Sequence, residues 1–457
     1  MNTTSKAETS AALSRRAIVL RVLTLAWPVV VEQVLGTVVG LVNTYIVSHL
    51  GASALAAVGL CTQVNGLLMA MFAAIGVGST ALVARHIGAD EPKEAEWVAG
   101  QSLILALTVG IVSAVPYLVW GPSVLLLLGG ADDVVALGQS YLLALGTTMP
   151  LMALLYVGNA ALRGAGDTRT PMVVMGVVNV VNAVVSASLV YGAGPLPALG
   201  VLGAGVGAAV SVAVGGVIVV VTLLRGRSPS GLQVTRAALR FDRRHTLRLL
   251  HIGLPGGIEQ MAIRLAQLAM VTVVNQLGTA AYAGHQLGMQ LLTIAFMPGF
   301  AFSVAATTLV GQELGRGSPQ RAETSVHVAA WMAVGVMCGI GGVAFLLAEP
   351  LLRLFTDDPA VVVQGYYAMR GCAIIQLPLA VYFVLSGALR GAGDTRFVLF
   401  AQAVSIWLIR LPLSYRLGLT FGLGLTGVWA AMILDMVCRA VLQMLRFRRG
   451  AWKRLKV

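Results

Sequence analysis

The nine-residue string ALRGAGDTR stands at residues 161–169 and returns unchanged at residues 388–396, 227 positions later in a chain of 457 residues. The same offset relates other positions without gaps: Pro28, Glu32 and Gln33 to Pro255, Glu259 and Gln260; Leu50 and Gly51 to Leu277 and Gly278; and Gln63 to Gln290. The chain is therefore a tandem duplication of one unit, with both copies running in the same direction.

The composition is that of a membrane protein. Hydrophobic residues make up 58% of the chain and charged residues 11%, against about 25% charged residues in soluble domains. Twelve apolar runs are long enough to cross roughly 30 Å of hydrocarbon as helices. They cover about 24–49, 55–83, 97–119, 136–160, 171–192, 200–224, 250–276, 281–311, 325–348, 361–387, 397–416 and 424–445. Since lipid offers no backbone partners, the pattern predicts helices and no open sheet.

The repeat and the spans together predict an all-α membrane protein with two pseudo-symmetric six-helix bundles. We expect a cytoplasmic tail at 1–23, an N-lobe at 24–224, a basic cytoplasmic linker at 225–249, a C-lobe at 250–447 and a basic cytoplasmic tail at 448–457. Internal repeats of this size in an apolar chain are typical of transporters whose site lies between the repeats.

The net charge of +13 is explained by topology and does not indicate nucleic-acid binding. With the amino terminus inside the cell, 25 of the 31 Lys and Arg fall in the tails and in the segments that follow every second span. Only Arg353 and Arg416 fall in predicted external segments, and the other four lie within spans. This asymmetry predicts that both termini lie in the cytoplasm. The four cysteines fall in predicted spans without metal-ligand spacing, so we expect no metal cofactor.

The polar segments between spans carry two further predictions. The amphipathic stretch at 237–250, within the linker, predicts a short interfacial helix with its basic residues toward the lipid headgroups, the alternative being a plain tether. The repeated loops predict tight turns in which Asp and Thr cap the next helix. They lack the Walker spacing of a nucleotide site.

Glu32 and Glu259 are the leading candidates for coupling to an ion. Each lies four residues after a proline and just before a glutamine, at repeat-related positions inside a predicted span. Ionisable groups in a membrane are costly and are functional hypotheses by default. A central carboxylate can bind a proton or a sodium ion, and Glu259 is the candidate site for sodium. The alternative is structural, with each Glu satisfying backbone groups near its proline or pairing with Arg264.

Other polar residues in spans are candidates for the substrate cavity or for packing. Glu32, Gly36, Gly40 and Asn43 share one helical face, as do Glu259 and Gln267. The cavity candidates are Asn43, Gln63, Asn179, Asn182, Gln260, Gln267, His285 and Gln290; interhelical hydrogen bonding or packing is the alternative for the amides and the histidine. Asp435 is a third coupling candidate, although Arg439 four residues later also fits an intrahelical ion pair.

Several local motifs resemble one transporter family. Gly36 and Asn43-Thr44 before Leu50-Gly51, the repeated Gly-Ala-Gly-Asp-Thr loops, and Ala283-Gly284-His285-Gln286 after Leu277-Gly278-Thr279 are similar to the multidrug and toxic compound extrusion (MATE) family, over about residues 20–447. The resemblance implies two bundles around a V-shaped cavity and the export of cationic amphipathic compounds against a proton or sodium gradient.

The chain departs from that family's pattern at the residues that the resemblance makes important. The family's first-helix Asp corresponds to Asn43, and its fifth-helix Asn-x-x-Asn-x-x-x-Asp corresponds to Asn179, Asn182 and Ser186. Glu259 lies one turn from where some relatives carry a seventh-helix Glu. Both N-lobe carboxylates are therefore absent, which leaves Glu32 and Glu259 as the coupling candidates.

The sequence favours a secondary antiporter of the bacterial inner membrane that exports lipophilic organic cations by alternating access. We expect few positive charges in its cavity, contact with membrane lipids, no nucleic-acid partner and a monomer. The alternatives are a flippase for a lipid-linked or polyanionic substrate, whose cavity needs several Arg or Lys, an intramembrane enzyme and a channel. No cluster of catalytic groups and no filter-like motif supports the last two, so we expect no enzymatic activity.

Overall fold

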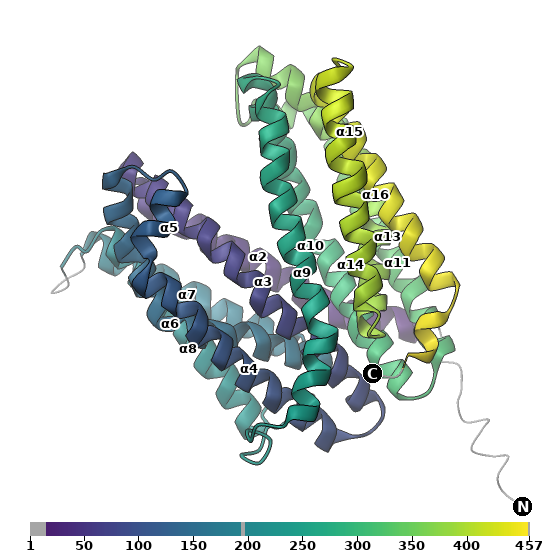
Figure 1. Cartoon of the computed structure of the whole chain (residues 1–457). Coiled ribbons are helices and arrows are strands. Elements are labelled where there is room, and N and C mark those ends of the chain that lie inside the picture. The colour runs from purple at the N-terminus through teal and green to yellow at the C-terminus, as the bar shows by residue number, and fades with distance from the viewer. Residues whose placement is uncertain (1–14, 193–196, 456–457) are drawn as a thin grey trace, which may run out of the picture.

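The structure, a computed structural model, describes residues 15–192 and 197–455. Twelve helices in these residues are long and apolar enough to cross a membrane, as predicted (Figure 1). They are α2 (Arg15–Ser48), α3 (Ala52–Gly88), α4 (Pro92–Val119), α6 (Asp132–Ala165), α7 (Arg169–Tyr191), α8 (Val201–Arg225), α9 (Arg243–Asn275), α10 (Thr279–Gly315), α11 (Pro319–Leu346), α13 (Pro359–Gly391), the composite span Thr395–Thr420, and α16 (Gly424–Arg448). The described residues contain no strand.

The backbone repeats as the sequence does. Helices α3 and α10 begin at residues 52 and 279 and end at residues 88 and 315, which keeps the offset of 227. Two short helices that were not predicted from the sequence, α5 (Gly121–Leu127) and α12 (Ala348–Arg353), begin with the same offset. The composite span is made of α14 (Thr395–Val404), the π-helix η1 (Ser405–Arg410), α15 (Leu411–Tyr415) and the π-helix η2 (Arg416–Thr420).

The repeated loops are tight turns, as predicted. Gly166 and Gly393 have φ of 94° and 87°, a region that an L side chain rarely adopts. The carboxylate of Asp167 accepts a hydrogen bond from the backbone N–H of Thr170 at 3.0 Å, so this Asp caps α7. Its counterpart Asp394 makes no such cap on the next helix and instead accepts from Nε of Arg446 at 2.7 Å. The predicted capping is therefore confirmed for Asp167 and wrong for Asp394 and Thr168.

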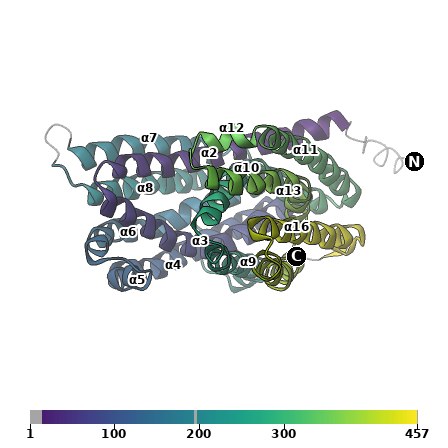
Figure 2. The same cartoon turned by 90° about the horizontal axis from the view of Figure 1, so that it is seen from above.

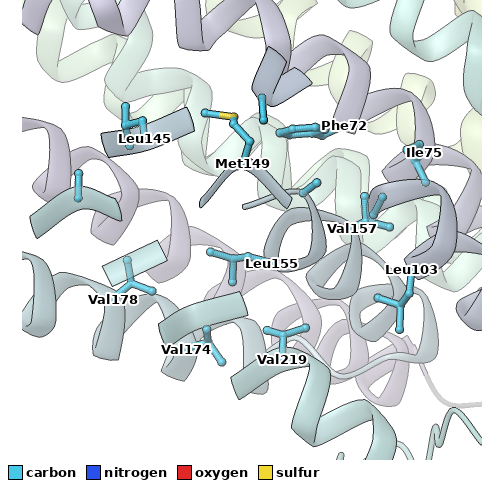
Figure 3. Close-up of a cluster of buried hydrophobic side chains, with 14 of the residues drawn as sticks. Phe72, Ile75, Leu103, Leu145, Met149, Leu155, Val157, Val174, Val178 and Val219 are labelled. Carbon is cyan, nitrogen blue, oxygen red and sulfur yellow. The ribbon is translucent and has the colours of Figure 1, made fainter. Parts of the chain in front are cut away.

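Each lobe has its own apolar core. Figure 3 shows part of the N-lobe core, where Phe72, Met149 and Leu155 pack together with Val219. The first halves of α2 and α9 cross between the lobes. Ile18 to Val29 of α2 contribute to the C-lobe core, while Leu249 and Ile252 of α9 contribute to the N-lobe core. Two exchanged half-helices thus connect the lobes. The domain boundaries predicted at residues 24 and 250 do not show this exchange.

The predicted interfacial helix is absent, which corrects the sequence analysis. Residues 231–242 form turns and irregular structure, and α9 begins at Arg243. The buried amide of Gln101 on α4 donates to the carbonyls of Ala238 (3.0 Å) and Arg240 (2.7 Å). These carbonyls are thus satisfied by a side chain and not by the backbone hydrogen bonds of a helix. Asp242 caps α9, and the N–H of His245 holds the pKa of that carboxylate below its usual range. The linker is therefore fixed to the N-lobe.

The two lobes meet closely at one end of the molecule, which we call the closed end. It holds the ends of α3 and α10, the linker and both described ends of the chain. Gly88 of α3 lies against the backbone of Gln312 of α10, and Arg85 of α3 donates to the carbonyl of Leu455 at 3.2 Å. Toward the opposite end the lobes diverge, with α5 and α15 far apart (Figure 1). Figure 2, viewed from above, shows the helices of both lobes side by side.

We predict that the closed end faces the cytoplasm. Alkaline phosphatase fused after Val457 should be inactive, because the basic segments on that side are retained inside and the enzyme needs an oxidising compartment for its disulfides. A truncated fusion after Gly129, between α5 and α6, should be active and serves as the control. An active fusion after Val457 would reverse the orientation.

Candidate functional site

A cavity of about 470 Å³ lies between the lobes. Its walls come from α2, α3 and α6 of the N-lobe and from α9, α10, α13, α14, η1 and α16 of the C-lobe. Methionine and aromatic side chains form much of the lining, and the amides of Gln33, Gln260, Gln267 and Gln402 add hydrogen-bonding groups. Such a mostly apolar, concave site suits an organic ligand of small size.

Glu259 lies on this wall and is paired. Nη2 of Arg390, in the last turn of α13, donates to its Oε1 at 2.6 Å. The side chains are only 2% and 17% exposed, so the two charges compensate each other away from solvent. A buried carboxylate without such a partner would be far more costly.

Glu32 repeats this arrangement in the N-lobe. Nη1 of Arg163 donates to its Oε1 at 2.7 Å, and both side chains are about nine-tenths buried. The two arginines are the third residues of the two ALRGAGDTR strings, which the sequence analysis assigned to cytoplasmic loops. They belong instead to the last turns of α6 and α13. The suggested pairing with Arg264 is wrong, since Arg264 bonds to Gln267 at 3.4 Å.

Both Glu–Arg pairs lie where a helix changes lobes. In α2, Val29 still packs in the C-lobe core, whereas Ile46 and Val47 pack in the N-lobe core. In α9, Ile252 packs in the N-lobe core and Met270 in the C-lobe core. Glu32 and Glu259 each lie between these two packed halves. A movement of one lobe against the other would therefore act on the helix segments that carry these pairs.

Asp435 is the centre of a third charged cluster. It is fully buried and accepts from Nε of Arg439, at 2.9 Å, and from Nε of Arg410, at 2.7 Å. The intrahelical pair with Arg439 was foreseen, but Arg410 comes from η1, where the wider π-helical turn marks a local departure from α-helix. Arg439 also donates to Gln402 at 2.9 Å. Two guanidinium groups thus share one carboxylate.

Three of the eleven candidate site residues predicted from the sequence line the cavity: Glu259, Gln260 and Gln267. The lining does not include Glu32, Asn43, Gln63, Asn179, Asn182, His285, Gln290 or Asp435. Gln63 and Gln290 are exposed. The ion-coupling role of any of these residues stays a prediction. Among the described residues, no group of three or more His, Cys, Asp or Glu could hold a metal ion.

The N-lobe amides and His285 make packing contacts. Asn179 donates to the carbonyl of Leu35 on α2 at 3.0 Å, which joins two helices. Asn182 contacts Ser186 Oγ at 3.4 Å, and Asn43 is buried with no partner for its Oδ1. His285 is buried edge-on against Trp429 with ring centroids 5.8 Å apart.

Asn43→Ala is predicted to weaken substrate affinity by a few-fold or to weaken helix packing. The pH dependence of transport should stay as in the wild type. The reason is that an amide cannot gain or lose charge in a proton cycle. Initial transport rates over a pH series would test this. A changed pH profile with unchanged affinity would contradict it.

The expectation of few positive charges in the cavity is wrong. Arg264, Arg390, Arg410 and Arg439 all line it, against one lining carboxylate, Glu259. Arg390 and Arg439 were missed as site residues, together with Gln402 and Tyr382. The sequence did carry a signal for Arg390. Glu32 and Arg163 are 131 residues apart, as are Glu259 and Arg390, so the glutamate and the arginine of each pair are duplicated together.

Comparisons with known proteins agree with this architecture. The MatE family model matches residues 28–187 and 255–416. The chain is 30% identical over 433 residues to the "Probable multidrug resistance protein NorM" of Thermotoga maritima, covering 95% of this chain and 93% of that protein. It is 30% identical to the multidrug resistance protein MdtK of Yersinia pseudotuberculosis, covering 93% of this chain and 94% of that protein.

A solved structure extends the similarity to three dimensions. The structure described as the outward-facing conformation of a multidrug resistance MATE family transporter of the MOP superfamily superposes with a TM-score of 0.88. The sequences are 25% identical, and the match covers 96% of this chain and 97% of that one. The fold predicted from the repeat and the spans is thereby confirmed.

Proposed function

This chain belongs to the multidrug and toxic compound extrusion (MATE) family of membrane transporters, and we propose that it exports amphipathic organic compounds across the bacterial inner membrane in exchange for protons or sodium ions. The two relatives compared above are named as a probable multidrug resistance protein and a multidrug resistance protein, and the twelve apolar helices of the described residues support a multi-pass membrane protein. These relatives do not favour the flippase alternative, and neither they nor the family model suggests an enzyme.

The observation that carries the proposal is the cavity between the lobes. Both repeats contribute to its walls, and the lobes touch at the closed end, where Gly88 lies against Gln312 and Gly315 against Arg85. A site shared by two repeats can be exposed to one side of the membrane and then to the other when the lobes rock. Cytoplasmic orientation of the closed end would make this conformation the one that releases substrate outward.

Of the two coupling ions, the geometry favours protons. Arg390 already donates to Oε1 of Glu259 at 2.6 Å, and it would have to move away before a sodium ion could be coordinated by both carboxylate oxygens. A proton on Glu259 or Glu32 would remove the attraction to its arginine and loosen the segment where the helix changes lobes. Coupling would then act through conformation, because the protonation state sets how easily the lobes move.

Purified protein in liposomes tests this function. Efflux or uptake of several dyes should follow an imposed pH gradient and stop when a protonophore collapses it. A sodium gradient without a pH gradient should have little effect. Transport driven by sodium alone would reject proton coupling, and no transport under any gradient would reject the exporter.

A further inference from the structure

We propose that the cavity contains an anion-binding subsite centred on Arg264, so that the preferred substrates are amphipathic compounds with an acidic group. This proposal names the substrate class of the exporter proposed above and so rests on that function. It replaces the organic cations expected from the sequence.

The charges around the cavity favour an anionic ligand. Four guanidinium groups line it, and the described residues supply only two carboxylates to oppose them, Glu259 on the wall and Asp435 behind it. Arg390 is balanced by Glu259, while Arg410 and Arg439 share Asp435. The surplus is two positive charges, which disfavours a lipophilic cation and attracts an anion.

Arg264 is the group that is free to bind. No carboxylate among the described residues lies within ion-pair distance of it, and its Nη1 donates a long hydrogen bond to Oε1 of Gln267 at 3.4 Å. Arg264 is exposed, and it lines the cavity from the middle of α9. A charged side chain in the middle of a membrane helix needs water or a partner. Its five donors suit a carboxylate or sulfonate.

The position of Arg264 shows that it faces the other lobe. A Cβ at Gly66 of α3 would lie 3.9 Å from the guanidinium carbon and Nη2 of Arg264, which is ordinary contact distance, so the guanidinium lies against α3. An acidic group bound there would lie between α9 and α3, which belong to different lobes. The apolar body of the ligand would contact Met69 of the N-lobe and Met289 and Phe296 of the C-lobe, which line the same cavity.

The charge of the substrate determines whether a transport cycle moves net charge across the membrane. An anion that leaves and a proton that enters both move positive charge inward. An inside-negative membrane potential should therefore accelerate export of an acidic substrate. Exchange of one monovalent cation for one proton moves no net charge and should not respond to the potential.

Two dyes with the same xanthene skeleton and opposite charge test the subsite: anionic fluorescein and cationic rhodamine 6G. Fluorescence polarisation with the full-length purified protein should show tighter binding of fluorescein. Arg264→Gln should weaken fluorescein binding by about tenfold or more, as expected for the loss of a charge-assisted hydrogen bond, and leave rhodamine 6G binding unchanged or improved. Arg264→Lys should retain part of the fluorescein affinity. Arg353→Gln, at an exposed pair outside the cavity, is the control.

The outcomes separate this proposal from the exporter itself. Tighter binding of rhodamine 6G, or fluorescein affinity that Arg264→Gln leaves unchanged, overturns the anion subsite even if proteoliposomes transport dye. Arg264-dependent fluorescein binding without transport under any gradient supports the subsite and rejects the exporter. Fluorescein export that a negative-inside potassium diffusion potential accelerates supports both.

Discussion

Glu259→Gln should abolish gradient-driven efflux while the protein still folds and inserts. Gln keeps the shape and the hydrogen bonding of the side chain, but it cannot bind a proton or balance Arg390, which donates to Glu259 at 2.6 Å. Removing one partner of a buried ion pair costs on the order of 3–5 kcal/mol. Transport into liposomes under an imposed pH gradient, together with size-exclusion profiles of the purified variant, would measure both effects.

A second variant distinguishes a coupling role from a structural one. Removing both charges, with Glu259→Gln and Arg390→Gln together, leaves no unpaired charge and should restore folding stability. If Glu259 must gain and lose a proton, this double variant remains inactive; if it transports at the wild-type rate, the pair is structural. Glu349→Gln, in the exposed pair with Arg353, is the control and should transport normally.

Glu32→Gln should impair transport in the same direction but less severely. Glu32 has the same kind of partner, Arg163, yet it does not line the cavity as Glu259 does. Equal and complete losses in both variants would indicate that the two lobes contribute equally. Wild-type ion dependence in both would place the coupling elsewhere, with Asp435 the next carboxylate to substitute.

The second large effect should come from the closed end. Gly88 and Gly315 are repeat-related, and each touches the backbone of the other lobe. A Cβ at Gly88 would lie 2.0 Å from the carbonyl oxygen of Gln312, and one at Gly315 would lie 2.1 Å from that of Arg85. Atoms cannot approach so closely, so Gly88→Ala or Gly315→Ala should hold the lobes apart at this end and stop transport.

Spin labels would report this opening directly. Lys93 and Gln320 are exposed, repeat-related positions near the closed end. Cysteines placed there, with the four native cysteines replaced, should show a longer distance between the labels in the Gly88→Ala protein. Gly335→Ala on α11, where nothing lies within 4 Å of the added Cβ, should leave distance and transport unchanged. Unchanged transport by Gly88→Ala would show that close contact here is dispensable.

The sequence by itself determined the architecture. Twelve apolar runs gave the spans, because the need to satisfy backbone groups in lipid acts within each segment. The offset of 227 predicted the repeat, and it also holds for the starts of α5 and α12, which were not foreseen. It placed Glu32 and Glu259 as equivalent positions, since identity at matched positions requires no knowledge of packing.

Only the tertiary structure decided the partners and the charge of the site. Arg163 and Arg390 look like loop residues, but the last turns of α6 and α13 bring them to Glu32 and Glu259, 131 residues away. Arg410 and Arg439 meet on Asp435 because a π-helical turn and α16 pack together. The exchange of half-helices between lobes is likewise set by packing. Hydrophobic periodicity says which face of a helix is buried, but it does not say which helix covers that face.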